Sequence, residues 1–188
     1  MIDPSQWKGD GVDHLNINKS AKTAVGRMLS HNHPFVFTHS VLGRFDSIES
    51  LWYYVQSEER DHRVRTLRGR ALKDHARSLT NVRVTNFRAI ILDSNWQKIR
   101  QHRNLVSLIR ASDLPFDCYH PNGHGALVRP IYTEWLLAGL NEIRSALQDH
   151  RTPMFDFLLD VPDSGIYDYI NAASELQRLH EYLESEVS

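Results

Sequence analysis

The helical spacing of apolar residues is the feature that most constrains the fold of this chain. Five segments carry apolar side chains at intervals of three and four residues, which places those side chains on one face of an α-helix. These segments cover residues 48–59, 68–79, 84–110, 131–148 and 164–184. The third segment is long and contains the polar letters QHRN, which indicates two helices that meet there. We therefore predict a predominantly α-helical chain.

Two shorter segments alternate in the manner of β-strands. In DHLNIN, Leu15 and Ile17 fall on one side of an extended chain, and asparagines fall on the other. HPFVFTHSVLGRF has the pattern of a hairpin, with Phe35 and Phe37 on one arm and a turn near Gly43. The predicted class is α+β, with a small N-terminal β-hairpin region among the helices.

The length of 188 residues suits one domain with a core large enough to fold alone. We expect an N-terminal arm over residues 1–12, a folded domain over 13–148, and a C-terminal helical extension over 149–188 that packs on the domain. This extension is acidic, with 9 Asp or Glu against 2 Lys or Arg. Its acidic helix is a possible docking surface for a protein partner.

The sequence predicts a cytoplasmic protein without a membrane partner. Cys118 is the single cysteine, so no disulfide can form within the chain, which points to a reducing compartment. The N-terminal residues are polar and lack the apolar run of a signal peptide. No apolar segment is as long as a membrane span.

Charge is distributed unevenly, although the net charge is only −1. Between Arg60 and Arg110 there are 13 Lys or Arg against 3 Asp or Glu. Such a segment is typical of a surface that binds a polyanion, and arginine suits bidentate contact with phosphate. The alternative is that the basic and acidic segments pack against each other.

The stretch RFDSIESLWYY contains an acid, Glu49, at the start of a helix. Asp46 and Glu49 have the spacing of a capping box, with Asp46 as the N-cap and Glu49 at the third helical position. Glu49 also falls on the flank of the apolar face, where a carboxylate is half buried and can still reach a ligand. From spacing alone, capping is favoured over catalysis.

Metal and cysteine chemistry have little support. His31 and His33 are two residues apart, and His120 and His124 are four apart, but neither pair has a cysteine or acid at a zinc spacing. Cys118 has the pattern of a small buried residue rather than of a nucleophile. We expect no metal and no cofactor.

Five polar residues remain as candidates for chemistry. Each also has an ordinary structural role: turn residues for the first two, a helix cap for the third, a surface lysine and a core aromatic for the others. They are Ser30, Asn32, Glu49, Lys73 and Tyr119.

In chain order, the segments that carry these residues resemble the NADAR family of NAD- and ADP-ribose-associated proteins, also called YbiA-like. GRMLSHNHPF is similar to the family's G-x-LSN followed by PF, with His31 at the position of the family's asparagine and Asn32 one place later. FDSIESLWYY looks like its S-x-E helix start, and LRGRALKDHAR like its G-x-x-AK-x-x-GR helix. KIRQHRNLVSLI is similar to KFxQNxxLxxxL, and LNEIR fits the closing helix.

The resemblance covers roughly 14–144 and ends before the acidic extension. The family's Trp-Gly and Gly-x-Asn elements near its C-terminus are absent, and FDCYHPNGHG stands in their place. The resemblance implies a NADAR-like fold with an added C-terminal helix. Because several such proteins are carried by phages or sit beside ADP-ribosylating toxins, it also implies a bacterial or phage-infected host cell and a possible anti-defence role.

The implied chemistry is cleavage of the bond between a ribose and a nitrogen. The family resemblance points to an N-glycosidase that removes ADP-ribose from guanine bases in nucleic acid and so reverses a toxin's modification. The catalytic residues would be Glu49 as general acid, base or electrostatic partner, and Lys73 as a phosphate contact or a Schiff-base nucleophile. The substrate-binding residues would be Arg27, Ser30, His31, Asn32, Trp52, Tyr53, Arg68 and Tyr119.

Two other functions stay open at this stage. One is an N-glycosidase that acts on a small nucleotide, such as an intermediate of the riboflavin pathway. The other is a protein that binds ADP-ribose or a related nucleotide without cleaving it. Turnover of a free nucleotide would favour the first, and tight binding without product would favour the second.

Overall fold

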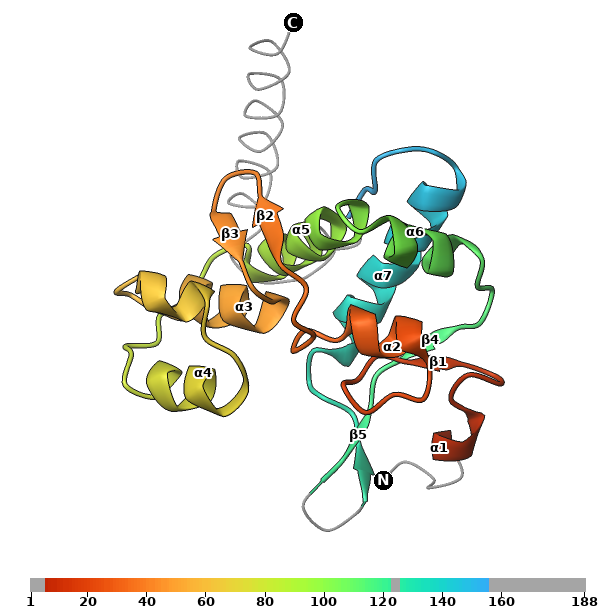
Figure 1. Cartoon of the computed structure of the whole chain (residues 1–188), viewed down its shortest axis with the longest axis horizontal. Helices are drawn as coiled ribbons and strands as arrows, with labels where there is room; N and C mark the ends of the chain where they lie inside the picture. Colours follow the sequence, from red (N-terminus) through yellow and green to blue (C-terminus); the bar gives the residue numbers. More distant parts are fainter. Residues whose placement is uncertain (1–5, 123–125, 156–188) are drawn as a thin grey trace, which may run out of the picture.

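The computed structural model describes residues 6–122 and 126–155 (Figure 1). The N-terminal half contains α1 (Gln6–Gly9), β1 (Leu15–Asn16), α2 (Ala24–Leu29), β2 (Phe37–His39), β3 (Gly43–Phe45), α3 (Ile48–Gln56), the 3-10 helix η1 (His62–Arg65) and α4 (Gly69–Ala76). The remainder contains α5 (Phe87–Arg100), α6 (Arg103–Arg110), β4 (Phe116–Asp117), β5 (His120–Pro121), β6 (Leu127–Val128) and α7 (Thr133–Gln148). The structure is therefore of mixed α and β class with mostly helical elements.

Helix α5 lies between two hydrophobic clusters and contributes to both. On one side, Leu92 and Ile99 pack with apolar residues of α2, α6, α7 and the short strands β1 and β4. On the other side, Ile91 packs with the hairpin, α3, η1 and α4. All three side chains are fully buried, and burying a side chain of this size stabilises the fold by about 2 kcal/mol. Figure 1 shows α5 between the group of α3 and α4 and the group of α6 and α7.

The long helical segment of the sequence is broken where the polar letters predict. Helix α5 ends at Arg100, and α6 begins at Arg103. The backbone N–H of His102 donates to the carbonyl of Ile99, and the His102 side chain contacts the carbonyl of Val36. The break therefore lets α6 turn away from α5 and pack on α7 and α2.

Strands β2 and β3 pair antiparallel within the segment that the sequence marks as a hairpin. Phe37 faces Phe45 across the pair, and both side chains are buried in the second cluster. Gly43 has a φ of +80°, a conformation that glycine adopts at low cost. Phe35 lies before β2 and stacks on His102, with 4.2 Å between ring centroids, so it belongs to the first cluster.

The other strands form two short pairs, one between distant parts of the chain and one between neighbouring segments. β1 pairs in parallel with β4, with Leu15 opposite Phe116. β5 pairs antiparallel with β6. The first pair ties the N-terminal segment to the region before α7.

Helix α3 begins differently from the prediction. The N-cap is Ser47, not Asp46, and the capping box joins Ser47 to Ser50. The Ser47 Oγ accepts from the Ser50 N–H, and the Ser50 Oγ accepts from the Ser47 N–H, at 3.0 and 3.2 Å. The expectation that Glu49 caps this helix was wrong, because two serines satisfy the same backbone groups. The Glu49 carboxylate is left for other contacts.

Some sequence expectations fall outside what the structure describes. The C-terminal helix predicted over 164–184 lies beyond residue 155. The division into an arm, a domain and an extension stays a prediction. Within the described ranges, none of the helices is long and apolar enough to cross a membrane.

Candidate active site

The loop after α2 brings three predicted residues to the start of α3. The His31 carbonyl accepts a hydrogen bond from the Glu49 backbone N–H at 2.9 Å. Asn32 Nδ2 donates to Glu49 Oε1 at 3.4 Å, and Ser30 Oγ donates to Asn32 Oδ1 at 3.2 Å. These bonds fix the loop against the first turn of α3, with the Glu49 carboxylate held by a side-chain amide.

Glu49 also pairs with Lys73, the other predicted catalytic residue. The distance between Lys73 Nζ and Glu49 Oε1 is 3.5 Å. The Glu49 side chain is 13% exposed and the Lys73 side chain 45% exposed. Because the Lys73 end of the pair is exposed to solvent, the pair contributes under about 1 kcal/mol to folding. Fold stability alone therefore does not explain why these two residues are paired.

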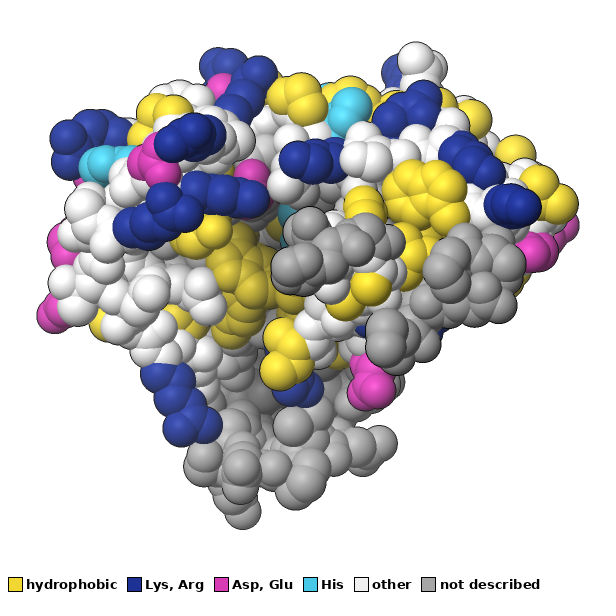
Figure 2. All heavy atoms as spheres, turned by 90° about the horizontal axis from the view of Figure 1, so that it is seen from below, with side chains coloured by type: hydrophobic (Ala, Val, Ile, Leu, Met, Phe, Trp, Pro, Cys, Tyr) yellow, Lys and Arg dark blue, Asp and Glu magenta, His cyan; other side chains and the backbone are white. Residues whose placement is uncertain are grey.

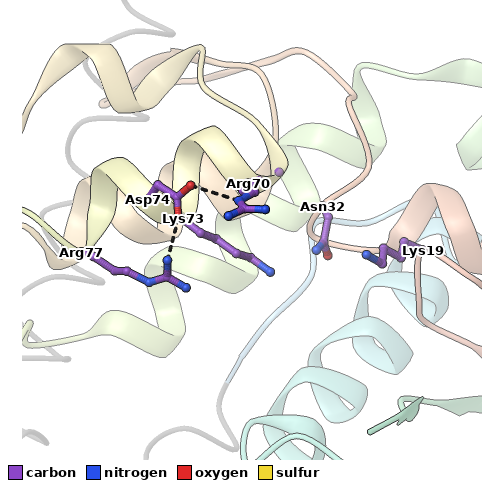
Figure 3. Close-up of a pocket in the computed structure, with 7 residues that line it drawn as sticks. Lys19, Asn32, Arg70, Lys73, Asp74 and Arg77 are labelled. Atoms are coloured by element: carbon purple, nitrogen blue, oxygen red, sulfur yellow. Dashed lines mark hydrogen bonds and ion pairs between the residues drawn. The ribbon is translucent and has the colours of Figure 1, made fainter. Parts of the chain in front are cut away.

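Lys73 lines a pocket of about 510 Å³ (Figure 3), so its pair with Glu49 stands at the edge of that pocket. Glu49 contacts two of the residues that line it, Asn32 and Lys73. The lining residues are Lys19, Asn32, Gly69, Arg70, Lys73, Asp74 and Arg77. Four of these seven side chains are cationic and one is acidic, so the pocket suits an anionic ligand.

Asp74 organises two of the cations. Arg70 Nε lies 3.4 Å from Asp74 Oδ2, and Arg77 Nη1 lies 2.6 Å from Asp74 Oδ1. Figure 3 shows these two arginines flanking Asp74 on α4, with Asn32 and Lys19 on the opposite side of the pocket. Both arginine side chains are largely exposed, so they keep N–H groups available to a ligand.

Aromatic side chains adjoin the carboxylate. The ring of His31 lies 5.9 Å from that of Trp52 and 6.0 Å from that of Tyr132, on which it stacks. Trp52 also contacts Phe87 and Trp135. Burial raises the pKa of Tyr132 to about 12, and the negative charge of Glu49 adds to the effect, so Tyr132 stays neutral beside the carboxylate.

Two buried polar residues of α5 lie beneath the loop. Asn95 Nδ2 donates to Ile91 O and lies 3.3 Å from His31 Nε2. Lys98 Nζ donates to the carbonyls of Leu29 and Ser30 at 3.4 and 3.3 Å. Lys98 is fully buried, and burial lowers its pKa to about 7. Burial, and then the charge of Lys98, lower the pKa of His31 to about 3.

Three predicted substrate-binding residues are engaged elsewhere in the fold. Arg27 Nη1 donates to the carbonyls of Ala21 and Lys22. Arg68 pairs with Asp46 at 2.7 Å. Tyr119 is fully buried, and its hydroxyl joins His14 Nε2 at 2.6 Å and the Gln6 carbonyl at 3.0 Å. None of the three lines the pocket.

The remaining predicted residue, Tyr53, is half-buried at the edge of the second cluster. Its phenol is close enough to Tyr132 to influence that residue electrostatically. Tyr53 therefore belongs to the aromatic surroundings of Glu49 and does not line the pocket.

The described residues offer no support for a cysteine nucleophile or for a metal site. Cys118 is buried, and burial raises its pKa to about 11, which makes the thiolate unavailable near neutral pH. In the described ranges, no group of three or more His, Cys, Asp or Glu side chains could hold a metal ion.

Sequence reasoning matched Arg77 to the arginine of G-x-x-AK-x-x-GR but did not assign it to the site. It missed the pocket residues Lys19 and Arg70, the aromatic Tyr132, and the buried residues Asn95 and Lys98. Arg70 lies on α4 with Lys73, and Arg77 is the C-cap of that helix, so the two arginines are one turn from Lys73, at i−3 and i+4. That spacing was a usable signal. Lys98 begins the segment KIRQHRNLVSLI, which resembles a motif of the NADAR family, but nothing in the sequence indicated that its side chain is buried.

Comparison with known proteins gives a fold and no family. No family model and no curated protein matches this sequence. One solved structure is similar: it covers 74% of this chain and 90% of its own, with 15% identity and a TM-score of 0.53. At this identity the likeness shows a shared fold of mixed α and β class.

That structure is the NMR structure of the E. coli protein YbiA. The NADAR-like fold expected from the sequence motifs is thereby supported. A phage origin, an activity and a substrate stay predictions, because fold likeness does not carry them.

Proposed function

We propose that this protein is an N-glycosyl hydrolase that releases ADP-ribose from guanine bases in nucleic acid. The observation that carries the proposal is the Glu49–Lys73 pair at the edge of a cationic pocket. It joins a half-buried carboxylate, which such a reaction needs, to positive charge that suits a diphosphate. The YbiA-like fold and the sequence motifs support the same reading.

The reaction breaks the bond between C1″ of the ribose and a guanine nitrogen, and water adds to C1″. Positive charge builds on the sugar in the transition state, as in other glycoside cleavage. The Glu49 carboxylate would stabilise this charge and take a proton from the attacking water. The leaving nitrogen receives a proton, so the products are ADP-ribose and unmodified guanine. Asn32 would hold Glu49 for this task through its amide.

Lys73 has two possible roles in this scheme. Its ammonium could hold a phosphate or protonate the leaving nitrogen. As a free amine it could instead add to C1″ of the ring-opened sugar, expel the guanine nitrogen, and be released by water. The ion pair with Glu49 favours the first role, because an ammonium has no free electron pair.

The surrounding residues suit the two ends of the substrate. Arg70, Arg77 and Lys19 would bind the diphosphate from opposite sides of the pocket. The rings of Trp52, Tyr132 and His31 contact one another near Glu49 and form an aromatic cluster on which a base could stack. Arg27 and Arg68, which the sequence suggested for the diphosphate, are engaged with partners in the fold.

A basic surface near the pocket favours nucleic acid over a free nucleotide. Figure 2 shows several Lys and Arg side chains on the side of the molecule where α4 lies, beside a hollow in which hydrophobic side chains are visible, and further Lys and Arg side chains across the same face. Such a surface would contact phosphates beyond the modified nucleotide. Binding to DNA should then weaken steeply as salt is raised.

The test is release of free ADP-ribose from a DNA oligonucleotide that carries ADP-ribosyl-guanine, measured beside release from the modified mononucleotide. The proposal expects turnover of both, with a higher kcat/KM on the oligonucleotide. Preference for the mononucleotide would favour a small-nucleotide glycosidase. Binding of ADP-ribose without product from either substrate would favour a non-catalytic nucleotide-binding protein.

A further inference from the structure

Lys98 is unusual because its side chain is fully buried, where an ammonium group is costly, and because it forms no ion pair with an acid among the described residues. Its polar contacts are the carbonyls of Leu29, the last residue of α2, and of Ser30, the C-cap of that helix. The C-terminal end of a helix carries exposed carbonyls and partial negative charge, which a buried cation can offset. Lys98 therefore ties α5 to the end of α2.

The end of α2 leads directly to the candidate active site. Ser30 follows α2 and holds Asn32 through its hydroxyl. Asn32 and the His31 carbonyl then contact Glu49 at its carboxylate and its backbone N–H. An unbroken series of hydrogen bonds thus runs from buried Lys98 to the Glu49 carboxylate through the loop 30–32.

We propose that Lys98 is a positioning residue that holds the loop 30–32 in the arrangement in which Asn32 and His31 orient Glu49. Lys98 touches no reacting atom, since it is fully buried beneath the loop and does not line the pocket. Asn95, one turn earlier on α5, supports the same loop from His31. The importance of this for catalysis rests on the proposed function, but the positioning itself does not.

The decisive experiment measures backbone amide hydrogen exchange by NMR and needs no activity. Two adjacent amides report on different partners. The Glu49 N–H is bonded to the His31 carbonyl of the loop, whereas the Ser50 N–H is bonded to Ser47 inside the capping box. A change in loop position should affect the first amide and leave the second unchanged.

The variant is Lys98→Met, which keeps the length of the side chain and removes its donors. The matched control is Gln97→Met, because Gln97 is the buried neighbour on α5 and its side chain contacts Arg100 instead of the loop. For Lys98→Met we expect exchange of the Glu49 amide to accelerate at least 10-fold relative to Ser50. For Gln97→Met we expect the ratio of the two rates to stay as in the wild type.

Two results would overturn the proposal. One is an unchanged ratio in Lys98→Met, whether or not both rates rise together through lower global stability. The other is an equal change of the ratio in Gln97→Met, which would assign the effect to α5 in general. If Lys98→Met unfolds, Lys98→Gln, which keeps one donor group, is expected to fold and to show an intermediate ratio. An unchanged ratio there also counts against the proposal.

Failure of the proposed function would leave these exchange rates untouched, so the two ideas can fail separately. If the protein does hydrolyse ADP-ribosyl-guanine, a double-mutant cycle adds the catalytic link. Lys98→Met and Asn32→Ala should each lower kcat, and the double variant should be no slower than the worse single variant. If the loss of kcat in the double variant equals the product of the two single losses, Lys98 does not act through Asn32.

Discussion

Two polar clusters in this protein contain the residue types of an active site, yet their surroundings differ. Around Glu49, the contacts are an amide at 3.4 Å and an ammonium at 3.5 Å, beside a cationic pocket. Around Tyr119, the hydroxyl is enclosed between His14 and the Gln6 carbonyl and is fully buried. The polar contacts of the Glu49 carboxylate are long, and a ligand in the pocket can reach it. The Tyr119 hydroxyl has shorter hydrogen bonds and is shielded from any ligand.

Exposure and the length of the polar contacts separate a candidate reactive cluster from a structural one. The Tyr119 cluster includes an acid, a histidine and a tyrosine in contact, since Asp13 also contacts His14. However, its tyrosine faces a main-chain carbonyl and the ring of Trp7, so it serves to hold the N-terminal segment. The Glu49 cluster contributes little to stability and is open to a ligand.

Apart from the loss expected on changing Glu49 itself, the largest expected effect is the loss of activity on changing Lys73 at the pocket. Lys73→Met should lower release of ADP-ribose by about 100-fold, equal to about 2.7 kcal/mol of transition-state stabilisation, while unfolding free energy changes by less than about 1 kcal/mol. Kinetic assays and urea denaturation measure the two quantities. Lys8→Met, at an exposed lysine on α1, is the control and should leave both unchanged. Equal losses of activity in both variants would contradict the role of Lys73.

The Tyr119 cluster should respond in the opposite way. Tyr119→Phe removes a hydroxyl from two buried partners and should cost about 2 kcal/mol of unfolding free energy, with activity retained at a temperature where the variant is folded. Urea denaturation and the release assay test this. Loss of activity at full stability would mean that Tyr119 belongs to the site after all.

The lowered pKa of His31 predicts how the unfolding free energy of the protein changes at acid pH. Its pKa is about 3 in the folded protein against 6.5 for an ordinary histidine, because burial and Lys98 oppose its charge. Between these values the unfolded chain binds the proton and the folded chain does not. Stability should therefore fall as pH falls from about 6.5 to about 3, by up to about 1.4 kcal/mol per pH unit.

The variant His31→Phe tests this assignment, since it keeps an aromatic ring and removes the titrating group. Unfolding free energies measured between pH 3 and 6.5 should lose that part of their pH dependence. An unchanged slope would show that other groups control acid stability.

The smallest effects are expected from the surface cations. Arg70→Ala and Arg77→Ala should each weaken binding to DNA a few-fold and lower the slope of log affinity against log salt by about 1. Fluorescence anisotropy at several salt concentrations measures both. Arg63→Ala, an exposed arginine on η1 that pairs with Asp61 and does not line the pocket, tests whether the effect is specific to the pocket. An equal effect there would indicate a diffuse basic surface.

Much of the secondary structure followed from local patterns, because periodicity and turn residues act over a few positions. The break at Gln101 and His102 and the turn at Gly43 are examples. The start of α3 was misassigned because Asp46 and Ser47 are both favourable N-cap residues. The structure selects Ser47, whose hydroxyl and backbone N–H both bond to Ser50.

The site was harder to predict because its contacts cross long stretches of chain. Glu49 and Lys73 were taken together from the family resemblance, and no local pattern places them in contact. Tyr119 was misleading for the same reason, since its partners lie 105 and 113 residues earlier in the chain. Burial of Lys98 depends on packing between α2 and α5, which letters alone do not reveal.

The central claim is that Glu49 is a reacting group and not a helix cap. Its most direct test compares Glu49→Gln with Glu134→Gln in the release assay on DNA carrying ADP-ribosyl-guanine. Both glutamates lie in the first turn of a helix, α3 and α7, so the control matches any loss of favourable charge there. We predict that Glu49→Gln folds and releases ADP-ribose about 10²- to 10⁴-fold more slowly, which is the usual contribution of a general acid or base, while Glu134→Gln keeps the wild-type rate. Equal rates in the two folded variants would contradict the account and leave Glu49 without a catalytic role.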